Sequence, residues 1–163
     1  MLPPSAHRRA DRVDVLEDGR LAILDYKTGA LPTGPDIAEG DAPQLPLEAA
    51  MAARGAFREV PAGSATAALL YWRLTGGPEP GEVSDAGRLL ARLRGEADPA
   101  AAITAEAEAA WEHTRRLAAR YLLGEAPFTA RPHPARRPVA GDYDHLSRLA
   151  EWSGAEDAGG SAA

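Results

Sequence analysis

At 163 residues, with 45% hydrophobic side chains, the chain is long enough for one ordinary domain. Its formal net charge of −6 weighs slightly against a simple nucleic-acid-binding domain, since such domains are usually basic. The absence of cysteine excludes disulfides, thiolate-bound zinc and cysteine-ligated iron–sulfur clusters. No apolar run approaches the roughly 20 residues of a membrane span, and residues 1–10 have no apolar signal segment, so we expect a cytoplasmic protein without membrane contacts.

Two short strands joined by a tight turn are predicted near the N-terminus. Residues 10–16 carry valines at alternate positions, and residues 21–26 form a nearly continuous apolar run, typical of a strand buried on both faces. The segment between them contains Asp18 and Gly19, and an Asp-Gly pair is a strong hairpin signal. The sequence therefore predicts an antiparallel β-hairpin.

The rest of the chain alternates apolar segments with loops that contain glycine and proline. We expect a loop over 31–43, a helix over 44–54, a strand over 65–74, a short helix over 83–94, a long helix over 102–123 and a short helix over 143–152. The long helix has an apolar stripe at helical spacing and is followed by Gly124. These elements predict an α/β domain over residues 1–153, followed by a disordered tail over 154–163 that is rich in small residues.

Charged residues lie on the hairpin strands, where they are unfavourable. Asp and Lys are poor strand formers, and a carboxylate at the end of the apolar run, at Asp25, is costly unless it is paired or bound to a cation. Asp25 and Lys27 are two residues apart and therefore face the same side of the sheet. Asp11 shares that side if it lies opposite Asp25 or Lys27, which requires a bulge or an odd-length loop. A two-residue turn would place it on the other side, unless the strands separate near the site.

Converging carboxylates would create a site for a cation. If the side chains of Asp11 and Asp25 lie about 5 Å apart, their repulsion is about 3 kcal/mol at an effective dielectric constant near 20. A divalent cation would relieve this repulsion, and oxygen ligands without cysteine or clustered histidine favour Mg²⁺ or Mn²⁺. Such a cation would polarise a phosphate and activate water, while Lys27 stabilises the developing charge. The alternative is a surface ion pair between Asp25 and Lys27, worth about 0–1 kcal/mol.

Three short segments carry a family resemblance: A-D-R-V-D at 10–14, D-Y-K-T-G at 25–29 and Q-L-P-L-E at 44–48. They resemble the RecB branch of the PD-(D/E)XK nucleases, in which an A-D-R-I-D strand, a D-Y-K-T-G strand and a helix with Q-x-x-x-Y follow in this order at about this spacing. The resemblance implies a restriction-endonuclease-like core, in which a mixed sheet flanked by helices carries the site on its β-hairpin. It also implies a Mg²⁺-dependent deoxyribonuclease.

The resemblance assigns roles to individual residues of this chain. Asp11 and Asp25 would be metal ligands, with the backbone carbonyl of Tyr26 as a third candidate. Lys27 would be the catalytic lysine, and Gln44 would orient Lys27 or the substrate. The position of the family's tyrosine is occupied by Glu48, whose role the resemblance leaves open.

A closer resemblance is to the AddB family, the nuclease-bearing subunits of bacterial AddAB helicase–nucleases, and it extends over nearly the whole chain. It rests on Q-L-P-L-E-A-A-M at 44–51, Y-W-R-L-T-G-G at 71–77 and D-Y-D-H-L-S-R-L-A-E-W-S at 142–153. This resemblance implies an exonuclease domain in double-strand break repair and recombination, with DNA and an AddA-like helicase–nuclease subunit as partners. Some AddB proteins hold an iron–sulfur cluster through cysteines. Because this chain has no cysteine, we expect no such cluster.

The start of the chain departs from the family pattern. RecB-type domains place a helix with an acidic or histidine residue before the first motif strand, and His7 is the only such residue upstream of Asp11. We therefore expect a domain without its N-terminal helix that is weakly active or inactive alone. Two alternatives stay open: another RecB-type exonuclease, such as a CRISPR-associated or phage enzyme, and a degenerate PD-(D/E)XK module that binds DNA or a partner subunit without cleavage.

Overall fold

The computed structural model describes residues 10–78, 80–127 and 146. Packing divides the chain into two units, residues 1–117 and residues 118–163. The sheet and the candidate site belong to the first unit. The predicted domain limits stay a prediction, and His7, the tail and the helix expected over 143–152, apart from position 146, lie outside the described residues.

The predicted hairpin is confirmed and forms one edge of the sheet. Strands β1 (Arg12–Val15) and β2 (Leu21–Lys27) pair antiparallel. The Leu16 N–H donates to the carbonyl of Arg20 at 2.8 Å, so three residues lie in the loop, and Gly19 adopts a left-handed φ of 78°. This is the loop of odd length that the site hypothesis requires, in which a residue with positive φ follows a turn.

The sheet is mixed, as predicted, with strand order β1-β2-β3-β4. Strand β3 (Thr66–Arg73) runs parallel to β2, and β4 (Glu82–Asp85) runs antiparallel to β3. A parallel connection needs a crossover segment, which here contains α1 (Gly34–Ala38) and α2 (Gln44–Ala53). The helix predicted over 44–54 and the strand predicted over 65–74 are thereby confirmed.

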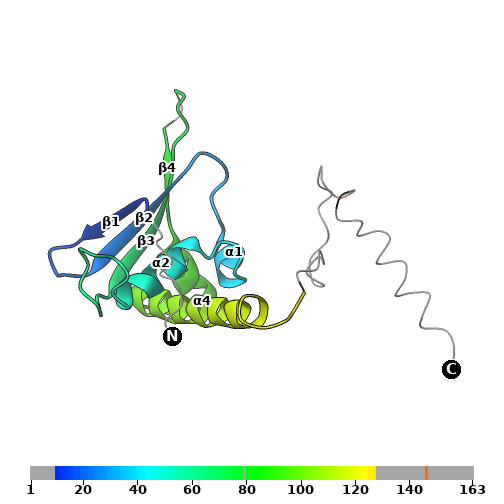
Figure 1. Cartoon of the computed structure of the whole chain (residues 1–163). Helices are drawn as coiled ribbons and strands as arrows, with labels where there is room; N and C mark the ends of the chain where they lie inside the picture. The colour runs from blue at the N-terminus through cyan, green and yellow to red at the C-terminus, as the bar shows by residue number, and fades with distance from the viewer. Residues whose placement is uncertain (1–9, 79, 128–145, 147–163) are drawn as a thin grey trace. The chain divides into compact units, whose positions relative to one another are not determined.

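The helices pack on one face of the sheet. Figure 1 shows α2 and α4 (Pro99–Tyr121) on the same side of the strands. Apolar residues of β2 and β3 are fully buried in the core on this side; they include Leu21, Ile23 and Leu69. Since side chains alternate along a strand, the next members of this row on β2 are Asp25 and Lys27. Within the described part of the chain, no helix combines the length and apolar character that a bilayer crossing needs.

Two expectations were wrong in detail. The segment over 31–43 is not only loop, because Thr33 caps α1 with a capping box in which its side chain and that of Asp36 bind each other's backbone N–H. The helix expected over 83–94 begins only at Ala86, in α3 (Ala86–Arg94), because Asp85 is its N-cap and accepts a hydrogen bond from the Arg88 N–H. The residues before this cap form β4 and pair with the end of β3.

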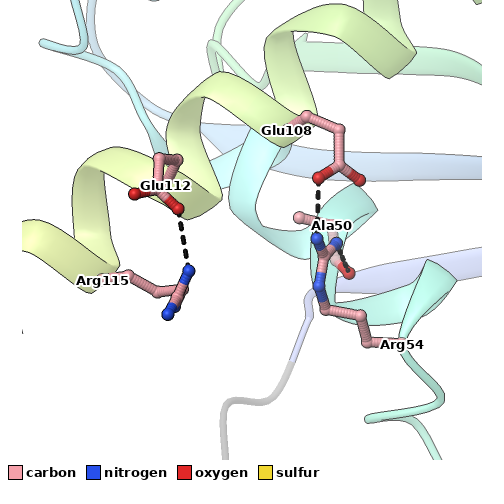
Figure 2. Close-up of polar contacts among 5 residues, drawn as sticks. All are labelled: Ala50, Arg54, Glu108, Glu112 and Arg115. Carbon is pink, nitrogen blue, oxygen red and sulfur yellow. Dashed lines mark hydrogen bonds and ion pairs between the residues drawn. The ribbon is translucent and has the colours of Figure 1, made fainter.

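Arg54, at the end of α2, fastens that helix to α4. Its guanidinium donates to the Ala50 carbonyl at 3.1 Å and to Glu108 at 2.7 Å (Figure 2). It also lies 4.5 Å from the centre of the Trp111 ring. A cation over an aromatic face is attracted by the electrons of the ring. Arg54 also lowers the pKa of Glu108 by hydrogen bonding, so the contribution of this carboxylate is present above its ordinary pKa and is lost as the pH falls toward the lowered value.

Replacing Arg54 by alanine should therefore loosen α2 from α4. We expect a loss of about 1–2 kcal/mol in the free energy of unfolding, because a cation–π contact and a backbone hydrogen bond disappear together. Urea unfolding measures this loss. Arg115→Ala is the matched control, since Arg115 binds the exposed Glu112 on its own helix at 2.9 Å (Figure 2) and the loss of this surface contact should leave stability unchanged. Equal losses in the two variants would contradict a special role for Arg54.

Candidate active site

Asp11 lies one residue before β1, beside the end of the paired hairpin. Arg12 lies opposite Leu24 and Val13 opposite Ile23, so the same register, continued by one residue, would set Asp11 against Asp25. Directly opposed residues project from the same face of an antiparallel pair. The Tyr26 N–H donates to Asp11 Oδ2 at 3.0 Å, which ties this exposed carboxylate to the end of β2.

Asp25 and Lys27 form a close ion pair on the helix-covered face. Asp25 is 2% exposed, and its Oδ2 lies 2.7 Å from Lys27 Nζ. The attraction between this carboxylate and the neighbouring ammonium group offsets part of the desolvation cost of both. The Lys27 side chain is about one-third exposed, so it joins the buried acid to the protein surface. This arrangement differs from the surface ion pair considered as an alternative, because one partner is buried.

Helix α2 contributes a row of polar side chains to the same cluster. Lys27 Nζ donates to Gln44 Oε1 at 3.3 Å, and Gln44 Nε2 donates to Glu48 Oε1 at 3.3 Å. Gln44 and Glu48 are four residues apart and therefore lie on one face of the helix. Glu48 is 1% exposed. A chain of polar contacts thus runs from Asp25 through Lys27 and Gln44 to Glu48.

Tyr71 of β3 completes the cluster from the neighbouring strand. It lies opposite Asp25 in the parallel register, and its ring centre is 5.8 Å from Lys27 Nζ. Its hydroxyl is buried and has no hydrogen-bond partner among the described residues. Burial raises the pKa of this phenol above its ordinary value, and the negative charges of Asp25 and Glu48 raise it further. The hydroxyl therefore stays protonated at neutral pH and can donate a hydrogen bond.

Tyr26 takes a different direction from its neighbours on β2. By strand alternation its side chain faces the opposite side of the sheet from Asp25 and Lys27, and its ring meets that of Trp72 edge-on at 5.9 Å. Only its backbone lies beside the cluster, through the N–H bound to Asp11. The predicted role of its carbonyl as a metal ligand stays a prediction.

The cluster suits a cation held by oxygen atoms. Asp25 Oδ2 is buried, and no directed hydrogen bond reaches it in the described part of the chain although Lys27 lies close. An oxygen with unused acceptor capacity is what a hard cation needs. Among residues 10–78, 80–127 and 146, no three acidic or histidine side chains converge as a ready-made metal site. Asp11 and Asp25 would supply part of a coordination shell, which suits Mg²⁺ because this cation usually keeps water and substrate phosphate as ligands.

Sequence reasoning missed Tyr71 and left Glu48 without a role. The signal for Glu48 was present in the spacing, because a carboxylate four residues after Gln44 among buried alanines shares the helix face of that glutamine. Tyr71 gave no such signal, since a tyrosine in an apolar strand reads as core. Only the parallel register of β2 and β3 brings it to Asp25.

A family model described as PD-(D/E)XK nuclease superfamily matches residues 9–138. This segment contains β1 to β4, α1 to α4 and every site residue described above. The match therefore covers well over half of the chain. It also agrees with the mixed sheet flanked by helices.

Curated relatives match over a short segment. Uncharacterized proteins of Rickettsia conorii and Rickettsia felis are each 42% identical over 48 residues, and one of Rickettsia typhi is 44% identical over 48 residues. Each match covers 29% of this chain and 6% of the relative, so the matched segment is a small part of much longer proteins. No solved structure matches the chain.

Proposed function

The chain belongs to the PD-(D/E)XK nuclease superfamily, and from this premise we propose that it is a divalent-metal-dependent deoxyribonuclease domain that acts as an exonuclease. The observation that carries the proposal is the position of Lys27 Nζ, which lies 2.7 Å from Asp25 and 3.3 Å from Gln44 at the end of β2. The third motif residue, Asp11, is tied to the same strand end through the Tyr26 N–H. The three sequence motifs thus supply neighbouring groups.

Each residue has a distinct role in this proposal. Asp11 and Asp25 would hold Mg²⁺ or Mn²⁺ through carboxylate oxygens, with the Tyr26 carbonyl as a third candidate ligand. When bound, the cation supplies charge neutralisation at the phosphate and lowers the pKa of a water molecule. Lys27 presents an ammonium group toward solvent, where it can donate to the attacking water or to a phosphate oxygen as negative charge develops. Gln44 accepts from Lys27 and limits where that ammonium can point.

The biological setting is proposed from the sequence motifs. The order and spacing of A-D-R-V-D, D-Y-K-T-G and Q-L-P-L-E resemble the RecB branch, and the segments around 71–77 and 142–153 resemble AddB. We therefore assign the domain to an AddB-type helicase–nuclease subunit that degrades DNA ends in double-strand break repair and recombination. An AddA-like subunit is its expected partner, and the cytoplasm its expected compartment.

The function is tested with linear duplex DNA and covalently closed circular DNA, each incubated with an excess of protein so that slow cleavage is detected. We expect Mg²⁺ or Mn²⁺ to support degradation of the linear DNA, EDTA to abolish it, and the circle to remain intact because it offers no end. Cleavage of the circle would contradict exonuclease action. If the protein binds DNA but cleaves it with neither metal, the enzyme hypothesis fails, and the alternative of a degenerate module that only binds DNA is favoured.

A further inference from the structure

Glu48 is a buried carboxylate on the core-facing side of α2. It is 1% exposed, and its neighbours on α2, among them Leu45, Ala49 and Ala52, are buried apolar residues. A buried carboxylate is costly unless other groups bind it. The contact that reaches it from the site is the amide of Gln44, whose Nε2 donates to Glu48 Oε1 at 3.3 Å.

The amide of Gln44 is held from both ends. Its oxygen accepts from Lys27 Nζ, and its nitrogen donates to Glu48. An ammonium can only donate and an ionised carboxylate can only accept. If the amide turned over, its NH₂ group would face the ammonium and its oxygen would face the carboxylate. Both contacts would become repulsive, so Glu48 and Lys27 together permit one orientation.

We propose that Glu48 is a positioning residue, which locks the Gln44 amide so that its oxygen receives Lys27 and keeps Lys27 Nζ beside Asp25. This inference rests on the proposed nuclease function and deepens it. The lysine needs such support because its side chain is long and about one-third exposed, and a free lysine side chain samples many rotamers. Asp25 attracts Nζ as its ion-pair partner, Gln44 accepts a hydrogen bond from it, and Glu48 fixes the orientation of that accepting amide.

The contacts favour this role over direct binding of a cation by Glu48. Glu48 Oε1 accepts from the Gln44 amide, whose oxygen in turn accepts from Lys27. In the described part of the chain no third acid converges with two others as a metal site. Glu48 also lies one side chain farther from Lys27 than Asp25 does, because Gln44 stands between them. Its effect on the reaction therefore passes through Gln44.

Glu48→Gln tests the proposal, because it keeps the shape of the side chain but removes the charge that dictates the amide orientation. We expect the single-turnover rate of DNA cleavage to fall about ten- to hundredfold, as for a misplaced catalytic group, while DNA affinity and Mn²⁺ affinity measured by calorimetry change by less than about threefold. Glu48→Asp should recover part of the rate. Glu106→Gln is the matched control, since Glu106 is a buried carboxylate on α4 that binds Arg94. Removing the charge of Glu106 should leave the cleavage rate unchanged.

A double-mutant cycle separates positioning from a general loss of structure. If Glu48 acts through Gln44, Glu48→Gln should lower the rate by less than about twofold in a Gln44→Ala background, because the amide to be oriented is gone. Independent, multiplying losses would overturn the proposal. So would a fall in Mn²⁺ affinity as large as that caused by Asp25→Asn, since this would make Glu48 a ligand.

NMR of the Gln44 side chain tests the positioning role without measuring DNA cleavage, so it can succeed or fail independently of the proposed nuclease function. The two side-chain amide protons of Gln44 should give well-separated NMR signals, because one of them faces a carboxylate, and the Gln44→Ala spectrum assigns them. Glu48→Gln should bring these signals together, whereas Glu106→Gln should not. If the unchanged protein fails to cleave DNA but shows this behaviour, the nuclease proposal fails and the positioning contact stands. If the signals do not respond to Glu48→Gln, the positioning role is refuted.

Discussion

Replacing Lys27 by methionine is expected to slow DNA cleavage by about a hundred- to a thousandfold, the usual cost of removing one donor to transition-state charge. Methionine keeps the unbranched apolar stem of the side chain but removes the ammonium that lies between Asp25 and Gln44. DNA affinity should change only severalfold, because one surface charge contributes little to backbone binding. Single-turnover cleavage with the protein in excess measures the rate, and a binding titration in Ca²⁺ measures the affinity.

Arg88→Met controls for the loss of a positive charge elsewhere. Arg88 is exposed on α3 and binds Asp85, the cap of its own helix, at 3.2 Å. This substitution should leave the cleavage rate unchanged. A similar fall in both variants would show that total charge, and not the position of Lys27, determines the rate. A Lys27→Met protein of full activity would reduce the Asp25–Lys27 contact to a structural ion pair.

The hairpin shows how much of the site geometry can be predicted from the sequence. Alternation placed Asp25 and Lys27 on one face with certainty, since a strand has only two faces. The position of Asp11 depended on the turn, and Asp18 and Gly19 alone suggested a two-residue loop that would have turned it away. The three-residue loop with Gly19 at positive φ gives β1 a register which, continued by one residue before Arg12, would place Asp11 on the face of Asp25. Turn geometry, not strand propensity, decides whether the acids converge.

Two elements were not predicted from the sequence, α1 and β4. The first depends on a helix cap and the second on pairing at the edge of the sheet. Helix α1 has five residues, too few to show an apolar period, and only the cap formed by Thr33 and Asp36 reveals it. Strand β4 is a four-residue edge strand with exposed residues, so it lacks the apolar pattern of a buried strand. It forms because β3 offers a free edge.

The positions of Gln44, Glu48 and Tyr71 in the site depend on contacts between segments that are distant in the sequence. Gln44 was predicted from its motif, and its contact with Lys27 follows from the packing of α2 on β2. Tyr71 and Glu48 reach the cluster only through the parallel pairing of β2 with β3 and the burial of one helix face. A single sequence does not specify these distances, because it shows neither which strands pair nor which helix face packs on them.

Asp25→Asn is expected to remove the stabilisation of the folded protein by Mg²⁺ and to lower DNA cleavage by about a thousandfold. A ligand that binds only the folded state stabilises it by about 2.7 kcal/mol at a hundred times its dissociation constant, so Mg²⁺ should raise the melting temperature of the unchanged protein. Asparagine retains the shape of Asp25 but offers a neutral oxygen, a weaker ligand for a hard cation. Thermal unfolding with and without Mg²⁺ measures the difference.

Asp14→Asn is the control that shows whether the effect is specific to Asp25. Asp14 lies on the same hairpin, but it faces the other side of the sheet, opposite Ala22, and its carboxylate binds Arg12 at 2.8 Å. Its replacement should preserve both the Mg²⁺ shift and the cleavage rate. If Mg²⁺ raises the melting temperature of Asp25→Asn as much as that of the unchanged protein, the cation binds elsewhere. Asp25 would then act only as the buried partner of Lys27, and the proposed metal-dependent chemistry would lose its principal ligand.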